Sequence, residues 1–287
     1  MNAPLHISGL AEIADQYDAL LCDAWGVIHN GIELFPGVAD ALTNFRETRG
    51  PVFILTNAPR LNDVIPPQLD RLGLPRSAYD GVVTSGDATR ASVEAFRGQP
   101  AFRLGPDKDD TLFEALDIEF VPLEQAKFIL CTGLFDDSTE TPEDYREMLS
   151  QAKELNLPMI CANPDTVVQL GDRMIYCGGA LAQVYDQLGG ETLLSGKPHE
   201  PIYDLAMSRL TKANNGTPPQ RVLAVGDGLQ TDILGANRHD LDVVFVAHGI
   251  FSKEARNDAG VLDMEKLNRL LSDHDVHAHA AMDQLAW

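Results

Sequence analysis

An aspartate at the end of an apolar segment is the clearest candidate for chemistry in this sequence. Asp23 follows Leu20-Leu21-Cys22 and precedes Ala24-Trp25-Gly26. A carboxylate in an apolar setting is costly unless it is paired, bound to a metal ion or reactive. We therefore expect Asp23 to act as a nucleophile or a metal ligand. Trp25, two residues later, cannot act as an acid, because an indole offers one N–H donor and no titratable proton at neutral pH.

Three further residues, Thr56, Lys197 and Asp227, could act together with Asp23. Thr56 and Asp227 directly follow apolar segments, as Asp23 does. Open α/β sheets bind their ligands beyond the carboxyl ends of the strands. The positions of these residues therefore predict one site that is built from several strand ends.

The elements that would position these residues are short apolar strands that alternate with amphipathic helices. This alternation predicts an α/β fold with a doubly wound parallel sheet of the Rossmann-like kind. A final apolar tail at residues 277–279 is expected to form an edge strand rather than a metal site. The predicted strands cover residues 18–28, 51–55, 81–84, 101–104, 128–131, 159–161, 174–176, 221–225 and 242–246. The predicted helices cover residues 36–46, 88–96, 111–116, 142–154, 180–188, 198–210 and 231–237.

The composition restricts the classes of function. A net charge of −21 over 287 residues argues against nonspecific binding to nucleic acid or to an anionic membrane, because both need a basic surface. No apolar stretch approaches the roughly 18 residues of a membrane span. The four cysteines form no CxxC pair and are expected to be buried free thiols in a reducing compartment. With no signal peptide in the first residues, we expect a cytoplasmic protein.

The intervals between the candidate residues indicate an inserted domain. From Asp23 to Thr56 and from Lys197 to Asp227, each interval is close to one βαβ step of about 30 residues. The interval from Thr56 to Lys197 exceeds one such step by about a hundred residues. We therefore expect residues 1–86 and 190–287 to form a core domain, with residues 87–189 inserted as an α/β cap domain.

Taken in order, four motifs resemble those of the haloacid dehalogenase-like hydrolase superfamily. The inserted cap is similar to the α/β cap of its subclass IIA, the nitrophenylphosphatase-like branch. Each motif alone has an ordinary structural explanation, such as a turn or a helix cap, whereas the ordered set is specific. The four motifs are Asp23-Ala24-Trp25-Gly26-Val27, Leu55-Thr56-Asn57, Ser195-Gly196-Lys197-Pro198 and Val225-Gly226-Asp227-Gly228-Leu229-Gln230-Thr231-Asp232. Further local matches are Val83-Thr84-Ser85-Gly86, Ala162-Asn163-Pro164-Asp165 and Gly171-Asp172-Arg173-Met174-Ile175-Tyr176.

The resemblance implies a phosphohydrolase that depends on Mg²⁺. Asp23 would attack phosphorus and form an aspartyl-phosphate, which divides one difficult displacement into two. The carboxylates of Asp23 and Asp227 and the backbone carbonyl of Trp25 would hold Mg²⁺, which prefers oxygen ligands. Asp232 would orient metal-bound water or Lys197.

The resemblance also implies which residues bind the substrate. Thr56 and Asn57 would bind phosphoryl oxygens, and Lys197 would neutralise charge in the transition state. Asn163 and Asp165 would contact the substrate from a loop of the cap. A cap of this size closes over the site, so we expect a small phosphorylated metabolite. Members of this branch form homodimers through the cap. The residues of this sequence do not determine whether it forms such a dimer.

The sequence departs from the superfamily pattern at Trp25. Phosphatases of the superfamily carry at this position an aspartate that protonates the leaving group and then activates water. Three interpretations therefore stay open: a phosphohydrolase that is slow or uses another proton donor such as His29, a binding or regulatory protein with negligible turnover, and a 2-haloacid dehalogenase. Halide leaves without protonation, but that chemistry needs no metal site.

Overall fold

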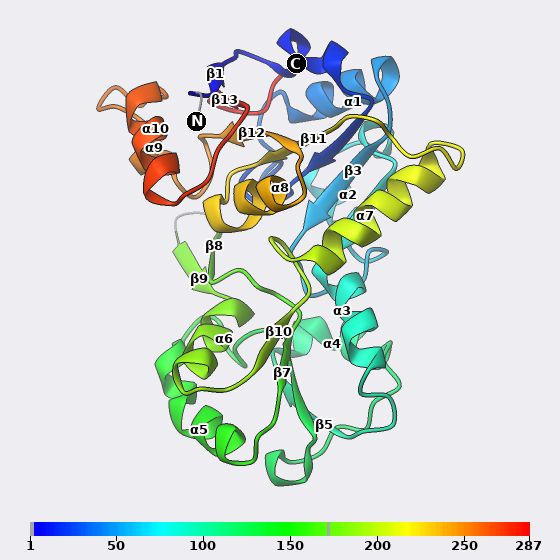
Figure 1. Cartoon of the computed structure of the whole chain (residues 1–287), viewed down its shortest axis with the longest axis vertical. Coiled ribbons are helices and arrows are strands. Elements are labelled where there is room, and N and C mark those ends of the chain that lie inside the picture. Colours follow the sequence, from blue (N-terminus) through cyan, green and yellow to red (C-terminus); the bar gives the residue numbers. More distant parts are fainter. Residues whose placement is uncertain (1–2, 171–172) are drawn as a thin grey trace. The chain divides into compact units, whose positions relative to one another are not determined.

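The computed structural model describes residues 3–170 and 173–287. The chain forms two compact units (Figure 1). The first unit comprises Met1–Thr56, Ile65–Val83 and Tyr203–Trp287, and the second comprises Asn57–Val64 and Thr84–Ile202. The expected functional division, with residues 1–86 and 190–287 in a core and residues 87–189 in a cap, stays a prediction.

A seven-stranded sheet forms the centre of the first unit, in the order β1-β13-β12-β11-β2-β3-β4. From the central pair β2 and β11 the chain proceeds outward in both directions, through β3 and β4 on one side and through β12 and β13 on the other. This order confirms the predicted doubly wound α/β fold. The strands are β1 (Leu5–His6), β2 (Ala19–Cys22), β3 (Val52–Thr56), β4 (Gly81–Thr84), β11 (Val222–Gly226), β12 (Asp242–Val246) and β13 (Ala280–Met282).

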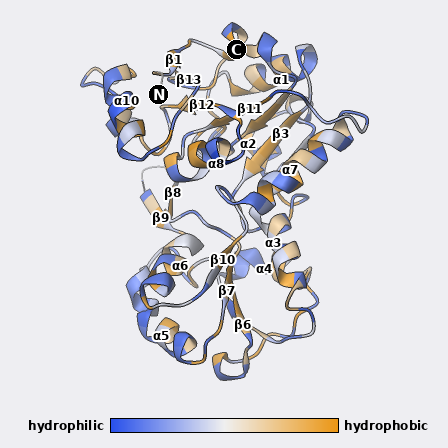
Figure 2. Cartoon of the chain, viewed as in Figure 1, coloured by the Kyte–Doolittle hydropathy of each residue, from blue (hydrophilic) through white to orange (hydrophobic). Residues whose placement is uncertain are grey.

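Helices flank this sheet, and its central strands β2, β3 and β11 are mostly apolar (Figures 1 and 2). Every residue of β2, β3 and β11 is buried. Parallel strands that are covered on both faces have this continuous apolar pattern. The helices of the first unit are α1 (Val38–Thr48), α2 (Ile65–Leu72), α7 (Glu200–Ala213, which begins in the second unit), α8 (Leu234–Arg238), α9 (Ser252–Ala255) and α10 (Met264–Asp273).

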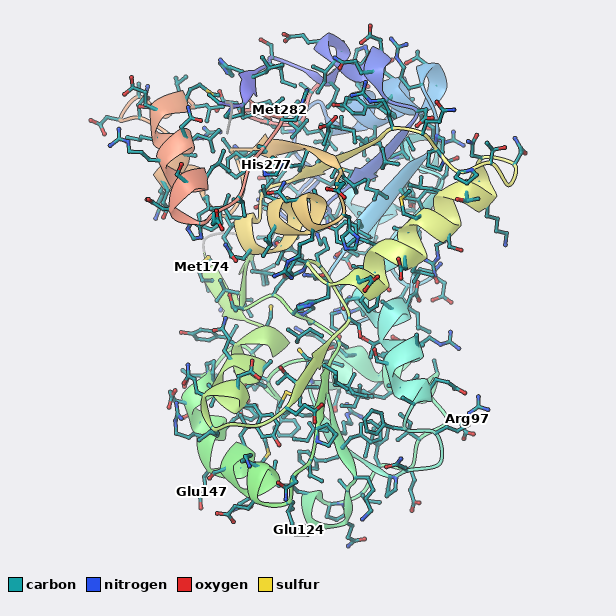
Figure 3. The ribbon with its side chains drawn as sticks, in the orientation of Figure 1. Arg97, Glu124, Glu147, Met174, His277 and Met282 are labelled. Atoms are coloured by element: carbon teal, nitrogen blue, oxygen red, sulfur yellow. The ribbon has the colours of Figure 1, made fainter. Side chains whose placement is uncertain are left out.

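The sequence prediction was wrong about the last strand. β13, which contains Met282 (labelled in Figure 3), lies inside the sheet between β12 and β1 rather than at its edge. Leu5 and His6 form the edge strand and pair in parallel with Ala280 and Ala281. A two-residue strand is too short to leave a pattern in the sequence, so the true edge could not be predicted.

The first predicted strand is shorter than expected. β2 ends at Cys22, because the chain turns at once: the backbone N–H groups of Ile28 and His29 both donate to the carbonyl of Ala24. Gly26 has φ +89°, which favours glycine, and completes this turn. The turn keeps Asp23 at the end of the sheet instead of inside a long strand.

The second unit contains a smaller parallel sheet in the order β10-β7-β6-β5 and a separate antiparallel hairpin of β8 and β9. The strands are β5 (Ala101–Leu104), β6 (Phe128–Cys131), β7 (Met159–Cys161), β8 (Val167–Leu170), β9 (Arg173–Tyr176) and β10 (Thr192–Leu194). The helices are α3 (Ser85–Glu94), α4 (Asp110–Glu114), α5 (Arg146–Glu154) and α6 (Gly178–Gln187).

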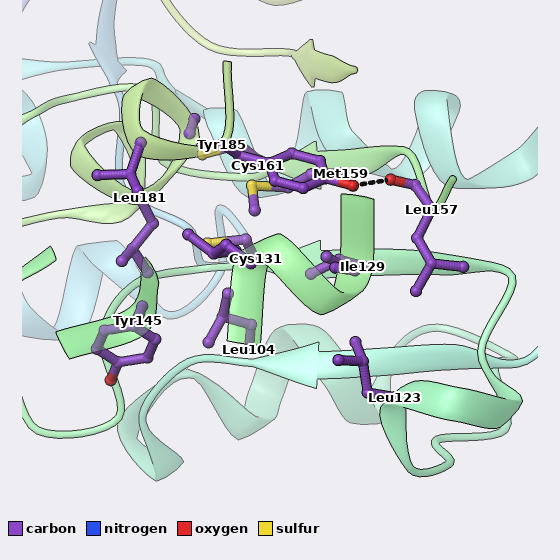
Figure 4. Close-up of a cluster of buried hydrophobic side chains, with 14 of the residues drawn as sticks. Leu104, Leu123, Ile129, Cys131, Tyr145, Leu157, Met159, Cys161, Leu181 and Tyr185 are labelled. Carbon is purple, nitrogen blue, oxygen red and sulfur yellow. Dashed lines mark hydrogen bonds between the residues drawn. The ribbon is translucent and has the colours of Figure 1, made fainter. Parts of the chain in front are cut away.

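The second unit has a hydrophobic core of its own (Figure 4). Leu104, Ile129 and Met159 from three neighbouring strands pack there with Tyr185 of α6. The Tyr185 hydroxyl donates to the backbone carbonyl of Leu157, so this large side chain is buried without an unsatisfied polar atom. This core gives the loops at the ends of β5, β6, β7 and β10 a rigid support.

Two further findings bear on the class of protein. All four cysteines are free and buried, as predicted. None of the helices in the described part of the chain is long and apolar enough to cross a membrane.

Candidate active site

The two central strands of the first sheet bring two predicted site residues together. Cys22 and Val225 are register partners in the parallel pair of β2 and β11. Asp23 follows β2, Asp227 follows β11, and the Asp23 backbone N–H donates to the carbonyl of Val225 at 2.9 Å. Here the chain order reverses direction, and such a switch point is where open α/β sheets bind ligands.

Three carboxylates meet at this switch point. Asp23, Asp227 and Asp232 each offer an oxygen, and these three oxygens lie within 4.8 Å of one another. The three residues are only 5–6 % exposed. Three buried carboxylates at this separation repel one another strongly unless positive charge lies among them.

Asp227 is held in place from two sides. The backbone N–H of Ile250 donates to its Oδ2 at 2.7 Å. Two glycines lie directly against its carboxylate: a Cβ on Gly26 would be 2.3 Å from Oδ2, and one on Gly249 would be 1.8 Å from it. Only glycine fits at either position without displacing Asp227. The sequence interpretation did not include Gly249 and Ile250, because the Ala247-His248-Gly249 segment looks like an ordinary turn.

Asp232 is positioned by the start of the helix that follows Asp227. The backbone N–H of Gly228 donates to Asp232 Oδ2 at 3.1 Å. The turn at Leu229–Ile233 is a π-helix that continues into α8, whereas the sequence predicted one regular helix over residues 231–237. Single π-turns occur frequently at functional sites. This wider turn carries Asp232 back toward the end of β11.

The donor set fits a magnesium ion. Carboxylate oxygens are the hard ligands that Mg²⁺ prefers, and the described cluster contains neither a histidine nor a cysteine that would favour a softer metal. A divalent cation would also relieve the repulsion among the three buried acids. The three acids can therefore hold a hard divalent cation.

Trp25 lies in the turn after Asp23 and contacts His29. Their ring centroids are 5.2 Å apart in an edge-to-face arrangement, and the backbone N–H of Gly26 donates to the His29 carbonyl at 2.9 Å. Burial lowers the pKa of His29 to about 4, so its ring is neutral at neutral pH. Its Nδ1 accepts a hydrogen bond from the backbone N–H of Gly31, which assigns the ring proton to Nε2. A neutral imidazole is a very weak acid, which argues against His29 as the proton donor.

The other predicted residues are divided between the two units. Thr56 is buried at the end of β3 in the first unit. In the second unit, the Asn57 amide donates to Asp165 Oδ1 at 2.8 Å and to the Lys197 carbonyl at 3.1 Å. Its Oδ1 also accepts from the Lys197 backbone N–H at 2.7 Å. The Asn57 side chain therefore holds the Lys197 loop in place. The backbone N–H of Asn57 is then the group of this residue that could bind a phosphoryl oxygen.

The second unit thus joins its four predicted residues, Asn57, Asn163, Asp165 and Lys197, through hydrogen bonds. Lys197 is 2 % exposed, although lysine is among the residues that are rarely buried. The Asn163 Oδ1 accepts from the backbone N–H of Asp165 at 3.2 Å and closes a turn. Gly171 and Asp172, part of one predicted motif, lie outside the described residues.

Comparison with known proteins identifies the family. Residues 20–119 match the family model of haloacid dehalogenase-like hydrolases, and residues 194–267 match a model described as HAD-hydrolase-like. The crystal structure of a haloacid dehalogenase-like hydrolase from Brucella suis 1330 is 40 % identical, with a TM-score of 0.86 over 97 % of this chain and 99 % of that one. The chain therefore belongs to the haloacid dehalogenase-like hydrolase family, with the α/β cap of subclass IIA.

Two other similar proteins are named for their substrates. An acid sugar phosphatase from Staphylococcus saprophyticus is 26 % identical over 246 residues, which are 83 % of this chain and 89 % of that protein. A glycerol phosphate phosphatase from Mycobacterium tuberculosis, solved in complex with magnesium, has a TM-score of 0.63 and 20 % identity over 91 % of this chain and 78 % of that one. The second likeness shows the shared fold.

Proposed function

We propose that this hydrolase is a Mg²⁺-dependent phosphatase of small phosphorylated metabolites that reacts through an aspartyl-phosphate on Asp23. The observation that carries the proposal is the convergence of Asp23, Asp227 and Asp232 at the switch point of the sheet. The similarity to an acid sugar phosphatase supports the substrate class.

The carboxylates of Asp23 and Asp227 and the backbone carbonyl of Trp25 would hold the magnesium ion. When bound, the ion supplies positive charge that lets a carboxylate approach a phosphate. Asp232, anchored by the Gly228 backbone N–H, would orient the ion's water ligands from the start of the following helix.

In the first step, an Asp23 carboxylate oxygen forms a bond to phosphorus while the bond from phosphorus to the leaving oxygen breaks. Thr56 and the Asn57 backbone N–H would bind phosphoryl oxygens, and the Lys197 ammonium would offset the charge that develops on them. Asp165 would hold Asn57 in position, as its hydrogen bond indicates, and Asn163 would shape the adjoining loop.

In the second step, water attacks the phosphorus of the aspartyl-phosphate, which releases phosphate and restores the Asp23 carboxylate. The leaving oxygen of the first step takes its electron pair with it and needs a proton from solvent, because Trp25 has none to give. A positioned acid–base group contributes about 10²–10⁴-fold to such steps. We therefore expect slow turnover of alkyl phosphates.

Trp25 also supports a second candidate function, a phosphometabolite-binding or regulatory protein with negligible turnover. A 2-haloacid dehalogenase has less support, because halide displacement has no use for three converging carboxylates. Both candidates share the fold and the nucleophile position with the phosphatase.

One set of assays separates the three functions. Phosphate release from p-nitrophenyl phosphate and from glycerol 3-phosphate is measured at high enzyme concentration, after EDTA treatment and again after Mg²⁺ addition. We expect hydrolysis that is restored by Mg²⁺ and is faster for the aryl ester. Tight binding of glycerol 3-phosphate without product over hours would replace the phosphatase with a binding protein. Chloride release from 2-chloropropionate in EDTA would identify a dehalogenase.

A further inference from the structure

The second unit contains a buried ion pair that the proposed reaction does not use. Arg60 Nε lies 3.3 Å from Asp109 Oδ1, and the Asp109 side chain is 2 % exposed. The acid of a surface pair in the same protein, Asp70 with Arg76, is 45 % exposed. Asp109 ends the short 3-10 turn Asp107–Asp109 that follows β5.

This ion pair has a high desolvation cost for a contact that only holds a loop. Burial raises the pKa of the Asp109 carboxyl even though Arg60 lies beside it, so the pair does not fully offset the loss of solvation. An apolar contact of similar size would hold the loop at lower cost. What the ion pair does provide is a fixed direction for the Arg60 side chain, because Asp109 Oδ1 holds its Nε.

The backbone of Arg60 is fixed as well. A Cβ on Gly86 would lie 2.5–2.7 Å from the Arg60 carbonyl and amide atoms, so the two segments are in direct contact. The backbone N–H of Asn62 donates to Asp87 Oδ1 at 3.2 Å, and that of Gly86 donates to the Ala58 carbonyl at 3.2 Å. The segment of residues 57–64 is therefore fastened to the first turn of α3.

The outer end of the Arg60 guanidinium is still available. Within residues 3–170 and 173–287, its two Nη nitrogens make no hydrogen bond or ion pair, and the side chain is 28 % exposed. Two parallel N–H donors on a rigid plane match the two oxygens of a carboxylate or of a phosphate. A fixed side chain also loses little entropy on binding.

Arg60 is close in the chain to the predicted phosphate-binding residues. It lies four residues beyond Thr56 and three beyond Asn57, and four extended residues span at most about 14 Å. The net charge of −21 makes most of the surface repulsive to an anion, so a fixed arginine next to this segment is selective. We propose that Arg60 binds a second anionic group of the substrate, a carboxylate or a second phosphate, and that Asp109 positions it.

This inference rests on the proposed phosphatase function, because it assigns a substrate class to that reaction. It predicts that substrates with a second anionic group have lower KM values than neutral substrates of the same size. The probes are 3-phosphoglycerate and glycerol 3-phosphate, which differ only where a carboxylate replaces a hydroxymethyl group. Fructose 1,6-bisphosphate and fructose 6-phosphate form the matching pair for a second phosphate.

The test compares Arg60→Met with the wild type on both pairs. We expect KM for 3-phosphoglycerate or for fructose 1,6-bisphosphate to rise about 10–100-fold, the scale of one lost charge-assisted hydrogen-bond pair. The kcat values and the KM of the neutral partner should change little. The control is Arg97→Met, which removes the same charge from an exposed side chain of the second unit that points outward (Figure 3). Its KM values should match those of the wild type.

Asp109→Asn tests the positioning role. It should raise the KM of the substrates with a second anionic group by a smaller factor than Arg60→Met does, and leave kcat unchanged. Arg60→Lys should raise that KM less than Arg60→Met, because lysine keeps the positive charge but lacks the two parallel N–H donors of the guanidinium. Equal KM increases for the charged and the neutral partner would overturn the inference and leave Arg60 as a structural residue. If the wild type hydrolyses neither these pairs nor p-nitrophenyl phosphate with Mg²⁺ present, the proposed function fails. Calorimetric binding of 3-phosphoglycerate to the wild type and to Arg60→Met then still decides the role of Arg60.

Discussion

The two units contain parallel sheets that differ sharply at their carboxyl ends. In the first unit the chain proceeds outward in both directions from β2 and β11, so the ends of these two paired strands lie next to each other and carry Asp23 and Asp227. In the second unit, β5, β6, β7 and β10 follow one another across the sheet in a single direction. Its strand ends carry small or neutral residues, among them Gly105, Thr132 and Ala162. The reversal of strand order, rather than the strand sequences, gathers the acids.

The carboxyl ends of the two sheets also differ in how their acidic groups are balanced by other charges. The three acids of the first unit lie together and suit a divalent cation. In the second unit, Asp109 is paired with Arg60, and Asp165 accepts a hydrogen bond from the neutral Asn57 amide. We therefore expect metal dependence to be located at the edge of the first unit, and each prediction below tests that contrast.

The largest effect is expected from Asp23→Asn. Loss of the nucleophile should lower kcat by roughly 10⁴-fold or more, the scale of removing a covalent catalytic group. The measurement is phosphate release with saturating Mg²⁺. A protein that keeps wild-type kcat would exclude Asp23 as the nucleophile.

Asp18→Asn is the matched control, because Asp18 precedes the same strand at its opposite end. Its carboxylate accepts from the backbone N–H groups of Gln220 and Arg221 at 2.8 and 2.9 Å. The substitution should lower the free energy of unfolding by about 1 kcal/mol and leave kcat unchanged. Identical activity losses in both variants would indicate a general effect on folding.

Trp25→Asp should raise the hydrolysis of alkyl phosphates. A carboxylic acid at this position could protonate the leaving oxygen, and such a group contributes about 10²–10⁴-fold. The gain should be smaller for p-nitrophenyl phosphate, whose leaving group needs no proton. The ratio of the two gains is the measurement, with circular dichroism to confirm folding. A lower or unchanged rate on glycerol 3-phosphate would show that a missing acid is not the limitation.

The sequence predicted where the candidate acids lie better than it predicted the support around them. Asp23 and Asp227 could be placed together because each follows a strand of recognisable apolar pattern, and Asp232 was added by the family resemblance. The contact of Gly249 with Asp227 and the ion pair of Arg60 with Asp109 join segments far apart in the chain, which no local pattern reveals. Helix α2 was missed because Pro66 and Pro67 suggest a loop, although proline is tolerated in the first turn of a helix.

Asp232→Asn should weaken metal binding without removing a direct ligand. Changes to residues that orient metal ligands typically cost about 10–100-fold in affinity. The apparent Mg²⁺ affinity is measured by titrating activity, and the thermal shift on Mg²⁺ addition gives an independent value. Asp165→Asn, at the edge of the second unit, should leave the Mg²⁺ affinity unchanged. If the two variants lose Mg²⁺ affinity equally, the assignment of metal binding to the first unit is wrong.

The smallest effect is expected from a glycine-to-alanine substitution, which is compared at Gly249 in the first unit and at Gly133 in the second. In Gly249→Ala the new methyl group would overlap Asp227 Oδ2 at 1.8 Å, so Asp227 must move and its bond from the Ile250 backbone N–H must lengthen. Gly133→Ala places the same methyl group 3.7 Å from Pro106 Cδ, an ordinary contact distance. We expect Gly249→Ala to weaken Mg²⁺ affinity about tenfold and Gly133→Ala to leave it unchanged.

The thermal shift on Mg²⁺ addition separates this effect from plain destabilisation. Overpacking at Gly249 should lower stability by about 1–3 kcal/mol even without metal, because a buried methyl group displaces its neighbours. A misplaced Asp227 should in addition reduce the Mg²⁺-induced shift, which depends on affinity and not on the stability of the metal-free protein. A lower melting temperature with an undiminished Mg²⁺ shift would mean that Asp227 tolerates displacement, so that the tight glycine contacts serve packing rather than the metal.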